Sequence, residues 1–167
     1  MKSPHPNCYW VEPGLLLAGE YPRNIEDKVR SDKLQLLVDA GVGLFVDLTE
    51  EFELDPYHPW LKGPQHVRMP IQDMSVPSVP QMVKILDTLD AALEQEILPY
   101  IHCWGGIGRT GTVVGCWLAR HSQDENAGQA GLRELGLRWQ SCAKSDYCAS
   151  PQTPKQLSFV RSWEAGQ

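Results

Sequence analysis

The chain has 167 residues, 42% of them hydrophobic and 22% charged, a balance typical of one globular domain spanning residues 1–167. A net charge of −6 without a run of Lys or Arg argues against nucleic-acid binding and against an anionic membrane surface. Five cysteines without an apolar signal segment indicate a reducing compartment, so we expect a cytoplasmic protein. Cys142 and Cys148 lack neighbouring histidines that would complete a zinc site, so no metal is expected.

The first half of the chain predicts strands and one helix. Residues 9–22 read as two short strands around a Pro-Gly turn. A helix is predicted over residues 24–40, with Asn24 as a possible N-cap and Gly41 at its end. Residues 44–49 form a short apolar run typical of a buried strand, and residues 50–64 read as a connecting loop with at most one helical turn.

The second half alternates in the same way. Strands are predicted over residues 66–71 and 98–103, and turn-forming residues follow the first of them. Amphipathic spacing predicts helices over residues 81–94, from about Arg109 onward, over 125–138 and over 154–163. Alternating strands and helices predict an α/β fold, in which a mostly parallel, twisted central sheet is flanked by helices. Ligands of such sheets bind at the carboxyl ends of strands.

Two patterns overlap between residues 100 and 117. One is Gly-x-Gly-x-x-Gly, at Gly106, Gly108 and Gly111, which occurs where a dinucleotide pyrophosphate binds. A dinucleotide fold also needs an acidic residue at the tip of another strand about 20 positions later. Here the following region, residues 128–139, is helical in pattern and contains no strand. We therefore expect no nucleotide cofactor.

The other pattern is His-Cys-x5-Arg-Thr. Cys103 would lie at a strand end and before a helix, where loop amides and the helix dipole favour a reactive thiolate. Arg109 would grip two phosphate oxygens with its planar guanidinium, and Thr110 would offer its hydroxyl to the sulfur. Between them lies a predicted phosphate-binding loop, with glycine where the backbone must approach the ligand closely. Its variable residues are Trp104, Gly105, Gly106, Ile107 and Gly108.

The stretch HCWGGIGRTG resembles the active-site loop of the cysteine-dependent protein phosphatase superfamily, in both its tyrosine-specific and its dual-specificity branches. The resemblance implies the fold of the protein-tyrosine phosphatases, hydrolysis through a phosphocysteine intermediate, and no metal. In this family a general-acid aspartate lies on a loop about thirty residues before the cysteine. Asp73 matches that place, because it follows a predicted strand and precedes Cys103 by 103 − 73 = 30 positions.

A further segment, QTPKQLSFV, resembles the glutamine loop of the tyrosine-specific branch. By that match Gln152, and with it Gln156, would orient the water that hydrolyses the phosphocysteine. A purely structural role, in which Gln152 caps the last helix, stays open. Dual-specificity members generally lack this glutamine pair, so the chain combines features of two branches.

Several residues have ordinary structural roles as alternatives. His102 would point away from Cys103 on the strand and support the loop from behind rather than act as a base. Asp47 and Asp55 compete with Asp73 for the acid role, but both stand where an aspartate ordinarily caps a loop. Trp104 is expected to wall the pocket mouth.

The sequence thus predicts a protein phosphatase that acts on phosphotyrosine, with phosphoserine and phosphothreonine as further candidates. Its expected partner is a phosphorylated protein, and a monomer is expected. Two alternatives stay open. One is hydrolysis of a small-molecule phosphate monoester, although the loop carries no lysine of the kind that meets the extra phosphates of inositols. The other is a non-catalytic phosphate-binding module, which would typically lack the cysteine, the arginine or the aspartate.

Overall fold

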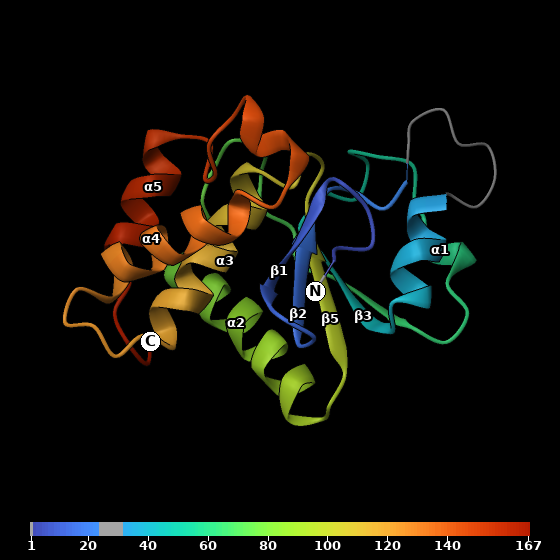
Figure 1. The fold of residues 1–167 in the computed structure, drawn as a ribbon, viewed down its shortest axis with the longest axis horizontal. Helices are drawn as coiled ribbons and strands as arrows, with labels where there is room; N and C mark the ends of the chain where they lie inside the picture. The colour runs from blue at the N-terminus through green and yellow to red at the C-terminus, as the bar shows by residue number, and fades with distance from the viewer. Residues whose placement is uncertain (1, 24–31) are drawn as a thin grey trace.

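A computed structural model describes residues 2–23 and 32–167 of the chain. Its five strands form one sheet in the order β1-β2-β5-β3-β4, in which only the β1–β2 pair is antiparallel (Figure 1). The strands are β1 (Cys8–Glu12), β2 (Leu16–Gly19), β3 (Val42–Asp47), β4 (Gln65–Arg68) and β5 (Leu98–His102). The sheet is therefore mostly parallel, as predicted.

Helices cover both faces of the sheet. Of the five α-helices in the described residues, four lie on one side of the sheet and one lies on the other (Figure 1). The group of four comprises α2 (Val79–Glu94), α3 (Gly108–Arg120), α4 (Ala127–Trp139) and α5 (Pro154–Arg161). The single helix is α1 (Asp32–Asp39), and two short 3₁₀ turns are η1 (His58–Trp60) and η2 (Ala143–Asp146). Each face has its own apolar core, which confirms the predicted α/β layers.

Each predicted element is present, with shifted ends. Gly41, at φ +92°, follows α1 as predicted, whereas Asn24 and the rest of the predicted helix to residue 31 lie outside the described residues. Strand β4 ends at Arg68 rather than at Ile71, since Pro70 cannot donate to a ladder. Helix α2 begins two residues early because the Ser78 side chain accepts from the amide of Gln81.

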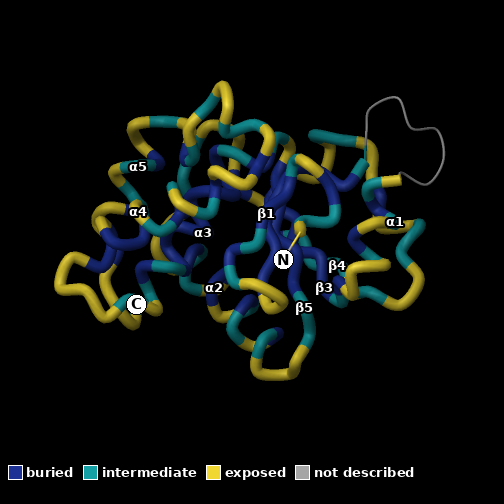
Figure 2. Tube along the Cα trace, in the orientation of Figure 1, coloured by how far each residue is buried: buried dark blue, intermediate teal, exposed yellow. Residues whose placement is uncertain are grey.

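The central strand β5 delivers the chain to the predicted loop. Its last four residues are buried, because α-helices cover both faces of the sheet at this point. Figure 2 shows the buried segments gathered along the strands and α3, with exposed segments mainly at the periphery. The loop therefore leaves the sheet at the carboxyl end of a fixed strand. Within the described residues, the structure holds no helix with the length and apolar character needed to cross a membrane.

Candidate active site

The predicted phosphate-binding loop runs from Cys103 to Gly108, between the end of β5 and the start of α3. Cys103 is only 3% exposed, and Trp104 at the loop's outer side is 48% exposed. Helix α3 has 13 residues and begins inside the loop at Gly108, so its positive end faces the same space. The structure thus places the loop at a strand end and a helix start, as the sequence predicts.

The carbonyl groups of this loop and of His102, which precedes it, accept hydrogen bonds from other parts of the protein. They accept hydrogen bonds at His102 from Leu48 N (2.9 Å), at Cys103 from His102 Nδ1 (3.4 Å), at Trp104 from Tyr21 N (2.9 Å), at Gly105 from Lys144 Nζ (2.7 Å) and at Ile107 from Ser150 Oγ (2.7 Å). In a trans peptide the next residue's N–H points opposite to the carbonyl. Fixing these carbonyls outward therefore turns the following amides inward. Among the described residues, the amides that follow the fixed loop carbonyls, at positions 104, 105, 106 and 108, donate to no protein acceptor.

Glycine is required at one loop position and closely packed at another. Gly106 has φ +74°, and a Cβ there would lie 2.4 Å from the carbonyl carbon of Gly19. At Gly108 a Cβ would lie 3.0 Å from the amide atoms of Gln156 and 3.2 Å from Oε1 of Gln152. The glycines that suggest a dinucleotide motif thus let the loop pack against strand β2 and the C-terminal segment.

Arg109 is oriented by a carboxylate that the sequence analysis missed. Its Nη1 and Nη2 donate to the two oxygens of Glu53 at 2.7 and 2.5 Å, and Nη1 also donates to the Ile71 carbonyl at 3.1 Å. Burial opposes the charge of Arg109, but the bonds to Glu53 raise the pKa of its guanidinium above the ordinary value. Burial likewise disfavours the Glu53 carboxylate, whose pKa Arg109 holds below its usual range. The buried Nε of Arg109 has no partner among the described residues.

Asp73 lies at the same guanidinium. Its Oδ1 is 3.0 Å from Arg109 Nη2, while its side chain stays 57% exposed. Met74 beside it adopts φ +57°, a left-handed conformation that closes a tight turn. The structure thus places Arg109 in contact with Asp73 and close enough to Cys103 to interact with it electrostatically, and these are three of the residues that the sequence assigns to chemistry.

Thr110 differs from the expectation. Its hydroxyl is buried and has no hydrogen-bond partner among the described residues, so the expected bond to the Cys103 sulfur is not formed. The residue lies in the first turn of α3, where the helix backbone fixes its Cβ direction.

Gln152 and Gln156 lie in different environments. Gln156 is buried, and its Oε1 accepts from the amides of Gln152 and Thr153 in a capping box at the start of α5. Its Nε2 donates to the carbonyl of Ser75, which ties the Asp73 loop to α5. Both ends of this amide are used inside the protein, so Gln156 has a structural role. Gln152 is exposed, with Oε1 beside Gly108.

His102 lies behind the loop in a buried polar network. Since its Nδ1 faces the Cys103 carbonyl, Nε2 accepts from the Tyr57 hydroxyl at 2.7 Å. Burial lowers the pKa of His102 to about 4, although Asp47 opposes this shift. The neutral ring supports the loop, as the sequence analysis expects.

Asp47 and Asp55 take structural positions. Asp47 is fully buried and accepts from both the amide and the hydroxyl of Thr49, with His66 and Arg68 also at its carboxylate. Although burial alone would raise its pKa, the hydrogen bonds from His66 and Thr49 hold it well below the usual range. Asp55 pairs with Arg23 at the surface.

The other four cysteines are free thiols. Burial raises the pKa of Cys8 to about 12 and that of Cys116 further, and it also raises those of Cys142 and Cys148. All four therefore stay protonated near neutral pH.

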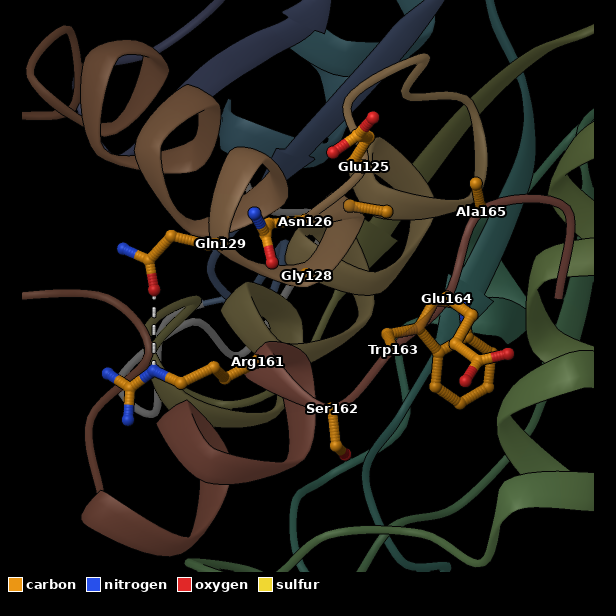
Figure 3. Close-up of a pocket in the computed structure, with 10 residues that line it drawn as sticks. Glu125, Asn126, Gly128, Gln129, Arg161, Ser162, Trp163, Glu164 and Ala165 are labelled. Atoms are coloured by element: carbon orange, nitrogen blue, oxygen red, sulfur yellow. Dashed lines mark hydrogen bonds between the residues drawn. The ribbon is translucent and has the colours of Figure 1, made fainter.

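A separate cavity of about 660 Å³ lies between the start of α4 and the end of α5 (Figure 3). Its charged lining residues are Glu125, Glu164 and Arg161, and Arg161 Nε is bonded to Gln129. This mixed lining contains no cysteine, the hydroxyl of its Ser162 donates to the carbonyl of Phe159, and none of its residues belongs to the phosphate-binding loop. Among the described residues no group of three His, Cys, Asp or Glu side chains is placed to hold a metal.

Comparison with known proteins finds a matching family and relatives among viral proteins. The family described as "Swiss Army Knife protein, DSP-PTPase phosphatase domain" matches residues 5–159. Protein 067L of Invertebrate iridescent virus 3, assigned as a tyrosine phosphatase, is 40% identical over 96 residues, covering 53% of this chain and 38% of that protein. Protein 197R of Invertebrate iridescent virus 6, similarly assigned, is 29% identical over 164 residues, covering 94% and 53%. The chain thus spans about half the length, or less, of these relatives.

Solved structures share the fold. Tk-PTP in its active form superposes with a TM-score of 0.71 at 23% identity, covering 93% of this chain and 95% of that one. A kinase-associated phosphatase with its catalytic cysteine replaced gives 0.71 at 20% identity, covering 93% and 91%.

Proposed function

Since the chain belongs to the DSP-PTPase family of phosphatase domains, we propose that it hydrolyses phosphotyrosine in proteins through a phosphocysteine intermediate on Cys103. The observation that carries this proposal is the set of loop carbonyls fixed outward around Cys103, with Arg109 closing the loop. Inward amides and a guanidinium match the three equatorial oxygens of a phosphoryl group in transfer.

The first step transfers the phosphoryl group to sulfur. The Cys103 thiolate attacks phosphorus in line, an S–P bond forms, and the P–O bond to the substrate breaks. The leaving oxygen takes the proton of Asp73, so the products are a free hydroxyl and a carboxylate. The exposed side chain of Asp73 suits this role, because it can reach a substrate that occupies the loop.

The second step returns the enzyme to its starting state. A water attacks phosphorus, Asp73 takes one of its protons, and the S–P bond breaks to release inorganic phosphate and the thiolate. Gln152 would orient this water from its exposed position beside Gly108. The loop amides and Arg109 stabilise the equatorial oxygens in both steps, so the mechanism uses no metal.

A protein substrate is favoured by the uncharged loop. The side chains at its variable positions, residues 104–108, carry no cation. A site for a polyphosphorylated small molecule would need further positive charge within reach. The viral relatives are assigned as tyrosine phosphatases, which supports phosphotyrosine as the first candidate, with phosphoserine and phosphothreonine next.

The experiment begins with para-nitrophenyl phosphate in the presence of EDTA. We expect turnover by the wild type, none by Cys103→Ser, and retained binding of tungstate by that variant. Appreciable turnover by Cys103→Ser refutes the nucleophile. Binding of tungstate without turnover by the wild type identifies a non-catalytic phosphate-binding module. A panel of phosphopeptides and of sugar and nucleotide monophosphates then separates protein from small-molecule substrates.

A further inference from the structure

One cation outside the Cys-x5-Arg segment touches the phosphate-binding loop directly. Lys144, in the 3₁₀ turn η2, donates from Nζ to the Gly105 carbonyl at 2.7 Å. The same Nζ lies 2.7 Å from Oε2 of Glu20, and the lysine side chain is only 13% exposed. The contact joins segments 39 residues apart in the chain, and neither the loop motif nor the general acid accounts for it.

Glu20 anchors this lysine with a second one. Lys33 Nζ lies 2.6 Å from the other carboxylate oxygen, and the Glu20 side chain is 11% exposed. Burial alone would raise the pKa of Glu20, but hydrogen bonds from Lys144 and Lys33 hold it below its usual range. With two ammonium groups on one carboxylate, the cluster carries one net positive charge behind the loop.

The backbone of Glu20 supports the same peptide. Its carbonyl accepts from the Tyr100 hydroxyl at 2.6 Å, which fixes the end of β2 to β5. A Cβ on Gly106 would lie 2.6 Å from the Glu20 amide nitrogen, so the loop packs directly on this segment. Lys144 therefore donates a hydrogen bond to a loop that packs against Glu20, the same residue that binds the lysine.

We propose that Lys144 is a positioning residue for the phosphate-binding loop, which directs the Gly106 amide at the bound phosphoryl group by holding the Gly105 carbonyl outward. This carbonyl and this amide belong to one peptide unit, so fixing one end aims the other. The glycine on each side gives the peptide little resistance to flipping, so an external anchor is required. The neighbouring carbonyls of Trp104 and Ile107 are held by uncharged donors, Tyr21 N and Ser150 Oγ.

The inference rests on the proposed phosphate chemistry, but its test does not require turnover. Tungstate binding is measured by calorimetry for the wild type, Lys144→Met, Lys144→Arg and Glu20→Gln. The control is Lys62→Met, which removes the same charge from an exposed lysine preceding β4, at the amino ends of the parallel strands. Removing one oxyanion donor commonly lowers the rate by a factor of about 10²–10³. A misdirected amide should lose only part of that stabilisation, so we expect Lys144→Met to bind tungstate about tenfold more weakly than the wild type.

Lys144→Arg should bind tungstate within about threefold of the wild type, because it keeps a charged donor, and Glu20→Gln should fall between the two at about threefold loss. Amide NMR adds a direct readout, since the Gly106 resonance should shift on tungstate addition in the wild type and shift less in Lys144→Met. If Lys144→Met does not fold, Glu20→Gln decides. The inference is overturned if Lys144→Met, or Glu20→Gln where Lys144→Met does not fold, binds tungstate with wild-type affinity. It is also overturned if Lys62→Met loses as much tungstate affinity as that variant. A wild type that binds tungstate without turning over overturns the proposed function alone.

Discussion

The pair between Arg109 and Glu53 gives the sharpest mutational test of how the arginine is oriented. The substitution Glu53→Gln keeps the shape of the side chain and removes its charge. Both residues are largely buried, with side chains 1% and 13% exposed, and two short hydrogen bonds join them. A glutamine offers one acceptor and turns its amide N–H groups toward the other guanidinium nitrogen, so one of the two bonds is lost.

The expected loss of stability in Glu53→Gln follows from the hydrogen bond that is lost. A hydrogen bond to a charged group is worth about 1.5–3 kcal/mol, so we expect about 2 kcal/mol less stability. Asp73 lies 3.0 Å from Arg109 Nη2 and competes for the released guanidinium. If the full 2 kcal/mol is felt in the transition state, kcat/KM falls about 30-fold, since about 1.4 kcal/mol corresponds to a factor of ten.

The assay combines kinetics with para-nitrophenyl phosphate, the inhibition constant of vanadate, and urea denaturation. Glu51→Gln is the matched control, since Glu51 lies exposed on the same loop. We expect the control to behave as the wild type in all three measurements. Unchanged kcat/KM and vanadate affinity in Glu53→Gln, together with lower stability, would refute the orienting role and leave a structural one.

Three further predictions follow from individual contacts. Ser150→Ala removes the bond to the Ile107 carbonyl and should weaken tungstate binding about threefold by calorimetry; unchanged affinity would show that this carbonyl needs no anchor. Gln152→Ala should slow only dephosphorylation, so stopped-flow traces should show a burst of phenol product, and its absence counts against the water-orienting role. Burial lowers the pKa of His102 and His5 to about 4. As pH falls, these histidines are therefore protonated in the unfolded chain at a higher pH than in the folded protein. The free energy of unfolding should therefore drop between about pH 6.5 and 4, by about 3 kcal/mol per histidine, and His5→Asn should flatten that slope in urea titrations; an unchanged slope would contradict this.

The elements and the loop could be predicted because they depend on local sequence. Strand β5 reads as an apolar run, and the loop has a fixed spacing from cysteine to arginine. The distance of 30 residues identifies Asp73 only through resemblance to a family. The structure then places Asp73 at Arg109, which no local rule requires.

The supports of the loop could not be predicted, because they are contacts between distant segments. Glu53 stands among four carboxylates in residues 50–55, and no periodicity distinguishes it. Lys144 lies in the short 3₁₀ turn η2 and Ser150 follows it, in a connection whose position depends on how α4 and α5 pack. The resemblance assigns Gln156 a role near the water, whereas the capping box and the Ser75 contact use both ends of its amide.

The most direct test of the account is capture of the phosphoenzyme. The Gln152→Ala variant is mixed with a phosphotyrosine peptide, quenched in acid within milliseconds, digested and analysed by mass spectrometry. The account predicts a phosphate on the sulfur of Cys103, absent from Cys103→Ser treated in the same way. Phosphate on another residue, or turnover of the peptide with no phosphoenzyme at any quench time, would contradict it.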